Sequence, residues 1–158
     1  MAFEFKPVYL LIYIINENMA HYQHTIDLPM PSPDLSPGEV IRLIVESLQQ
    51  NDATDLGIEV TFNFASPGNK SASGPLNNFK QQVKEPLFMP MLNFSSYKTS
   101  ELVSDGSQAQ QIIITQDQNG LDAGFLFTLT KQSESLYYDC WMTDSVRRVN
   151  PEVYGIAV

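Results

Sequence analysis

The chain has 158 residues, of which 43% are hydrophobic and 17% charged, enough to bury one sizeable core but hardly two. Its formal net charge of −9 argues against nucleic-acid and membrane-surface partners, since both need clustered Lys and Arg. The single cysteine, Cys140, cannot form an internal disulfide, which suits a reducing compartment and predicts a cytoplasmic location.

Residues 7–15 form the strongest apolar run, PVYLLIYII, which is too short for the roughly twenty residues of a membrane span. No small-residue cleavage site follows it, which disfavours an export signal. Three interpretations stay open: an extra β-strand, a lipid- or partner-facing tail, or an extension upstream of a natural start at Met19. We favour the third. The predicted organisation is an extension with a proline-rich lead (1–34), one domain (35–150) and a tail (151–158).

A helix is predicted from Pro37 to about residue 50. Ser36 and Glu39 match a capping box, and Pro37 occupies the first helical position. Apolar residues follow at helical spacing, so one face of this helix should lie on a core: Val40, Ile41, Ile44, Val45 and Leu48.

The next segment, residues 56–65, fits either a short helix or a strand by periodicity. Asp55 as the N-cap and Glu59 in the first turn favour the helix, which should end at Ser66-Pro67-Gly68-Asn69. A third helix is predicted after Gly74-Pro75, and it should stop before Pro86 because a residue ahead of proline is pushed out of helical geometry.

From residue 95 onward the pattern changes to strands. Asp105-Gly106 and Asn119-Gly120 are both typical of tight hairpin turns. Three helices followed by an antiparallel meander predict an α+β fold, with helices packed on a curved sheet. The predicted strands are residues 95–103, 109–117, 121–131 and 136–142.

The last predicted strand, residues 136–142, would carry apolar side chains on both of its faces. The outer face of the sheet should therefore be covered by the chain itself or by a second subunit. We expect a homodimer through the sheet.

Several segments together resemble an uncharacterised domain family associated with cyanobacteria and plants: residues 36–52, 57–67, 74–79 and 140–146. That family is similar in layout to the cone-shaped, cystatin-like or SnoaL-like domains of ketosteroid isomerase, nuclear transport factor and the polyketide cyclases. The resemblance implies a sheet curled around helices with a pocket between them. Such cones host enzymes, binding modules and transport adaptors alike, so the resemblance implies no particular activity.

Candidate pocket residues are the large apolar side chains that such a cone would enclose, although they would equally fill a plain core. They are Phe62, Phe79, Met91, Tyr97, Phe127 and Trp141. Asp144, with Tyr97 or Tyr138 as a hydrogen-bond partner, is the one constellation with acid–base potential. Its alternative interpretation is a turn acid that accepts from local amides.

Other site chemistry is not predicted. His21, His24 and Asp27 have ligand-like spacing but lack the anchors of a zinc motif, so we expect no metal site. No glycine-rich phosphate loop is present, and no cofactor is expected. Cys140 should be a buried, inert thiol.

Two functional hypotheses follow. The favoured one is a non-catalytic domain that binds a small apolar ligand or a partner protein, because the core-facing positions of the predicted elements carry neither carboxylate nor histidine. The alternative is a small cofactor-independent enzyme of the isomerase, cyclase or dehydratase type.

Overall fold

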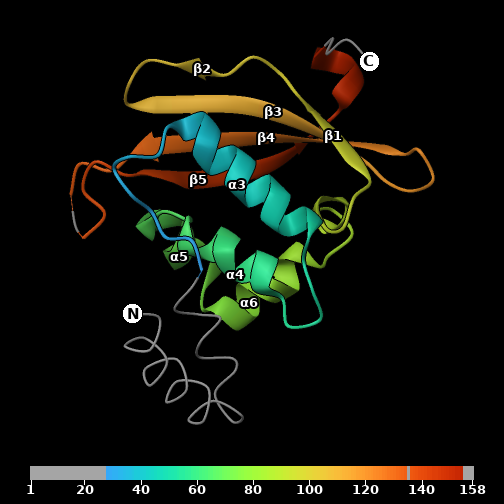
Figure 1. Ribbon diagram of the computed structural model, residues 1–158, viewed down its shortest axis with the longest axis horizontal. Helices are drawn as coiled ribbons and strands as arrows, with labels where there is room; N and C mark the ends of the chain where they lie inside the picture. The colour runs from blue at the N-terminus through green and yellow to red at the C-terminus, as the bar shows by residue number, and fades with distance from the viewer. Residues whose placement is uncertain (1–27, 135, 155–158) are drawn as a thin grey trace, which may run out of the picture.

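The computed structural model describes residues 28–134 and 136–154, and within them helices precede an antiparallel sheet (Figure 1). The α-helices are α3 (Pro37–Gln49), α4 (Leu56–Asn63), α5 (Pro67–Ser73) and α6 (Leu76–Val83). After the 3-10 turn η1 (Met89–Met91) come β1 (Ser96–Thr99), β2 (Val103–Ser104), β3 (Gln108–Gln116), β4 (Asp122–Lys131) and β5 (Trp141–Val149), then η2 (Pro151–Tyr154). The predicted α+β class is confirmed.

The sheet has the order β1-β3-β4-β5, with β2 also paired to β3. Its inner face is set by the β3–β4 register, which places Ile113 opposite Phe125 and Ala109 opposite Leu129. The apolar stripe of α3 packs on this face, and Ile41, Ile44 and Leu48 are each at most 1% exposed. Figure 1 shows α3 lying along the sheet, with α4, α5 and α6 grouped beyond the β5 edge.

Helix α3 begins as predicted. The Ser36 side chain accepts from the Glu39 N–H at 3.2 Å, and the Glu39 carboxylate accepts from the Ser36 N–H at 2.7 Å. Helix α4 also forms, with Asp55 at the predicted N-cap position, but the Asp55 side chain makes no capping hydrogen bond. Asp55 has a φ of 63° and instead pairs with Lys84.

Helix α5 differs from the prediction, in which Ser66–Asn69 only ends the preceding helix. Ser66 accepts from the Asn69 N–H and Pro67 takes the first helical position. The same Ser-Pro-Gly signature begins α3 at Ser36, so the signal was present in the sequence.

Two strand predictions are wrong in their bounds. The predicted strand 95–103 is interrupted between β1 and β2, where Ser100 bonds to Ile112 through both its backbone and its hydroxyl. The predicted strand 136–142 is largely a turn, and β5 begins only at Trp141. Asp139 has a φ of 67° there, and Gln132 exchanges backbone hydrogen bonds with Asp139 and Cys140 to close the turn.

The turn removes the two apolar strand faces from which the homodimer was predicted. Leu136 and Tyr138 are 90% and 66% exposed because they lie on this turn, and not because they cover a sheet face.

The expectations for residues 1–18 and for His21, His24 and Asp27 fall outside the described residues. None of the helices in the described part of the chain has the length and apolar character that a membrane crossing requires.

Helices α3 and α4 approach each other closely at Gly57. A β-carbon on Gly57 would lie 2.1 Å from the Ser47 carbonyl oxygen, so any side chain there must separate the two helices. We predict that Gly57→Ala lowers the free energy of unfolding by about 1–3 kcal/mol, the usual cost of overpacking.

Gly38→Ala is the matched control, because a β-carbon on Gly38 meets nothing within 4 Å. Alanine is the better helix former, so this change should leave stability unchanged or raise it by up to about 1 kcal/mol. Chemical denaturation of both variants tests the pair. Equal stabilities would show that the α3–α4 contact is not tight.

Candidate functional site

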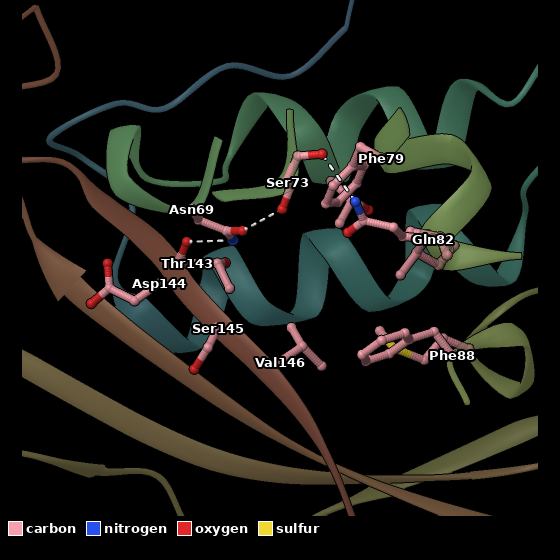
Figure 2. Close-up of a pocket in the computed structure, with 13 residues that line it drawn as sticks. Asn69, Ser73, Phe79, Gln82, Phe88, Thr143, Asp144, Ser145 and Val146 are labelled. Atoms are coloured by element: carbon pink, nitrogen blue, oxygen red, sulfur yellow. Dashed lines mark hydrogen bonds between the residues drawn. The ribbon is translucent and has the colours of Figure 1, made fainter. Parts of the chain in front are cut away.

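A pocket of about 220 Å³ lies between α5, α6 and β5, with α3 and η1 behind it. Its apolar wall comprises Leu48, Phe79, Val83, Phe88, Met91 and Val146. The polar lining consists of hydroxyl and amide side chains together with one acid: Thr61, Asn69, Ser73, Gln82, Thr143, Asp144 and Ser145. Figure 2 shows these residues projecting from the helices on one side and from β5 on the other.

The junction between α4 and α5 holds β5 at the pocket. The Thr143 N–H donates to the Phe64 carbonyl at 2.7 Å, and the Ser66 N–H donates to the Thr143 carbonyl at 2.8 Å. Ser66 is extended there because it is the N-cap of α5. The result is a parallel bridge between Ala65 and Thr143, which fixes the distance between helices and sheet.

A chain of polar contacts forms one side of the pocket (Figure 2). Asn69 Nδ2 donates to the Thr143 carbonyl at 3.0 Å, and Asn69 Oδ1 accepts from the Ser73 hydroxyl at 3.1 Å. Gln82 Nε2 donates to the Ser73 carbonyl at 2.9 Å. These contacts join α5 to both β5 and α6, so the polar side chains are held in place.

The Thr143 hydroxyl is buried without a hydrogen-bond partner. The residue is 3% exposed, and its Oγ1 is the one buried side-chain oxygen or nitrogen without a partner within residues 28–134 and 136–154. A hydroxyl offers one donor and two acceptor positions, and leaving them unmet in the interior costs about 1–3 kcal/mol. This polar atom lies in the lining of the pocket.

Three of the predicted site residues lie in this pocket: Phe79, Met91 and Asp144. The ring of Phe62 packs on Phe79 with centroids 5.3 Å apart, so it supports the apolar wall from behind. Phe127 and Trp141 are 0% and 7% exposed and belong to the core cluster.

Tyr97 lies elsewhere, in a separate groove with Arg42 between α3 and the β1–β3 edge. Its hydroxyl donates to Glu46 at 3.2 Å, and burial together with the Glu46 carboxylate raises the pKa of Tyr97. The structure does not bring Tyr97 and Asp144 together.

Asp144 is exposed, and its carboxylate accepts from the Thr130 hydroxyl. It lies where the β4–β5 register shifts between Thr128 and Leu129, so it is the extra residue of a bulge. Figure 2 shows its carboxylate directed away from Phe79 and Phe88. This geometry favours a structural role for Asp144, in which its carboxylate stabilises the β4–β5 bulge.

Glu59 is a buried carboxylate that the sequence analysis missed. It is 6% exposed on α4, so the expectation that residues 58–65 place no carboxylate in the interior is wrong. Lys80 on α6 pairs with it at 3.1 Å, and Lys84 pairs with Asp55 at 2.7 Å one turn further on. The two ion pairs join α6 to α4. Neither carboxylate lines the pocket.

Lys70 on α5 lies between two aromatic rings. Its Nζ is 5.3 Å from the ring centroids of both Phe62 and Tyr137. Burial lowers the pKa of this lysine, while the two rings favour its charged form through cation–π attraction. The arrangement holds the 137–140 turn against α5.

Among the described residues, no group of three or more His, Cys, Asp or Glu side chains is placed to hold a metal ion. No family model, curated protein or solved structure matches this chain. The resemblance to the cyanobacterial and plant family therefore stays a prediction.

Cys140 is 4% exposed, and burial, followed by the nearby Asp139 carboxylate, raises the pKa of its thiol. The thiolate is the reactive form, so the native thiol should be alkylated by iodoacetamide at pH 8 at least about tenfold more slowly than the unfolded chain. Mass spectrometry of timed samples, with and without urea, measures both rates. Similar rates would contradict the burial of Cys140.

Asp144→Asn should lower the free energy of unfolding by at most about 1 kcal/mol, because one exposed hydrogen bond to Thr130 is weakened. Thr130→Val removes the same contact from the other side and is the matched control. The double variant should lose little more than either single one. Turnover of an enone, hydroxyacid or polyketide-like substrate that is abolished by Asp144→Asn in folded protein would contradict this structural role.

Proposed function

We propose that this protein is a non-catalytic binding domain that takes one small, uncharged, largely apolar ligand in the pocket between α5, α6 and β5. The observation that carries the proposal is the lining: an aromatic and aliphatic wall with a few hydroxyl and amide groups. This combination is typical of small-molecule sites, where apolar surface supplies affinity and a few polar groups fix orientation.

The size of the pocket limits the ligand. A closed apolar cavity of about 150 Å³ accommodates benzene, so about 220 Å³ suits one ring with a short substituent. Drug-sized ligands need about 300 Å³ or more. A steroid or a polyketide would therefore exceed the pocket as it stands.

Catalysis is the weaker candidate. Isomerases and cyclases of the cone type need a carboxylate or histidine within reach of the substrate, as the general acid or base. Among the described residues of the lining, Asp144 is the one charged group, and it is exposed and accepts from the Thr130 hydroxyl. Hydroxyl and amide groups do not titrate near neutral pH, so they are poor general acids and bases, and the lining favours binding.

The proposal extends to the layout and the assembly. Helices on the inner face of an antiparallel sheet with a bulged edge strand are compatible with a cone-shaped domain. The proposed cytoplasmic location is supported by the single cysteine, which suits a reducing compartment. A homodimer through the sheet is also proposed. Its support is the resemblance to cone-shaped domains, many of which pair through their sheets.

Filling the pocket should abolish ligand binding. Val146 is half-buried in the pocket wall, so Val146→Trp places an indole in the space that the ligand would use. Val103→Trp is the matched control, because Val103 is 69% exposed on β2 and outside the pocket lining.

Native mass spectrometry of protein isolated from its source measures the effect. Wild-type protein and Val103→Trp should retain a co-purifying mass of small-molecule size, and Val146→Trp should lack it. A mass retained equally by all three proteins would place the ligand elsewhere and refute the proposal.

A further inference from the structure

We propose that the ligand carries a neutral oxygen, a hydroxyl or a carbonyl, that hydrogen-bonds to the side chain of Thr143. Thr143 would then be the specificity-determining residue of the pocket. The inference rests on the proposed function and adds the chemical class of the ligand: a single apolar ring with one uncharged oxygen-bearing substituent.

The first support is the position of the Thr143 side chain. In the β4–β5 register Thr143 lies opposite Leu129, which is fully buried on the inner face of the sheet. The side chain of Thr143 therefore points toward the helices, where it joins the lining of the pocket. It is more than nine-tenths buried, and its hydroxyl has no partner in the described part of the chain.

The second support is a comparison with the side-chain hydrogen bonds of two other buried threonines. Thr61 donates to the Gly57 carbonyl at 2.9 Å, and Thr115 donates to the Pro90 carbonyl at 3.0 Å. This fold thus satisfies a buried threonine hydroxyl by giving it a carbonyl acceptor. Thr143 has no such acceptor in the described part of the chain, although its backbone N–H and carbonyl are both hydrogen-bonded.

Because these backbone hydrogen bonds hold Thr143 in place, the residue cannot shift to give its hydroxyl a partner within the fold. Phe64 accepts from the Thr143 N–H, and the Thr143 carbonyl already accepts from both Ser66 and Asn69. The backbone is thereby fixed, and a β-branched side chain has few rotamers to choose from. A partner for the hydroxyl must come from the pocket.

The third support is that the described pocket lining offers hydrogen-bond donors but no positively charged side chain. Asn69 Nδ2 uses one of its two N–H groups on the Thr143 carbonyl, so a second N–H remains on this side chain of the pocket lining. Two donors in the lining favour an oxygen acceptor on the ligand. Within residues 28–134 and 136–154, no lysine, arginine or histidine is among the lining residues, so a carboxylate ligand would be buried there without a counter-charge, which is costly.

Three matched probes test the inference: benzyl alcohol, toluene and benzoate, which share a ring and differ in the polar group. Titrations followed by protein NMR report binding through the amide resonances of Asn69, Ser73 and Val146. Benzyl alcohol should bind about 2- to 12-fold more tightly than toluene, the range that one net hydrogen bond supports. Benzoate should bind more weakly than either.

Variants separate recognition from structure. Thr143→Val removes the hydroxyl with little change of shape, and it should reduce the preference for benzyl alcohol over toluene to what the Asn69 N–H alone supplies. Thr143→Ser should keep the preference. Without ligand, Thr143→Val should melt at or above the wild-type temperature, because an unpaired buried group is removed. Thr115→Val, the control at a satisfied threonine, should melt lower because the Pro90 carbonyl loses its donor.

Each contrary result would overturn a different part of the proposal. Equal binding of benzyl alcohol and toluene to the wild type would overturn the role of Thr143 and leave the pocket proposal standing. So would a clear loss of stability in ligand-free Thr143→Val, since the hydroxyl would then be satisfied within the fold, for example by water. Benzoate binding as tightly as benzyl alcohol would overturn the uncharged class. No response of the pocket resonances to any probe would overturn the proposed function itself.

Discussion

The structure depends on one short backbone pairing, between Thr143 at the start of β5 and the Phe64–Ser66 junction between α4 and α5. An edge strand needs partners for its outward N–H and C=O groups, and the junction supplies them at one residue. The pairing sets how far α5 and α6 lie from the sheet. The pocket occupies the space that this distance leaves, so its existence follows from a contact between segments far apart in the sequence.

The parts that sequence reasoning predicts correctly are those governed by neighbours in the chain. The α3 start follows from the Ser36–Glu39 capping box, and its burial follows from the apolar stripe. The turns at Gly106 and Gly120 have φ values of 90° and 81°, as tight hairpins require. Each of these features is decided within a few residues, so no knowledge of the rest of the fold is needed.

The wrong predictions concern features that depend on contacts beyond the local sequence. Alternating apolar residues at 136–142 resemble a strand, but Gln132 closes a turn on Cys140 and Asp139 takes a positive φ. Glu59 would be a surface residue on an isolated helix, and only the packing of α6 buries it beside Lys80. The candidate site is predicted in part for the same reason: Phe79 and Met91 are apolar wherever they fall, whereas Thr143 becomes notable only through its surroundings.

The buried polar groups of the described residues divide into those that form hydrogen bonds or ion pairs within the fold and one that does not. The Glu59–Lys80 pair and the hydroxyls of Thr61 and Thr115 all join one element to another or cap a turn of backbone. Thr143 contributes to the fold through its backbone alone, and its hydroxyl is left over. A rigid backbone carrying an unused polar group is a preorganised site, because little ordering entropy is lost when a ligand arrives. In the proposed binding site, structure and recognition therefore meet at this residue through different atoms: the backbone bonds to the α4–α5 junction, and the hydroxyl is available to the proposed ligand.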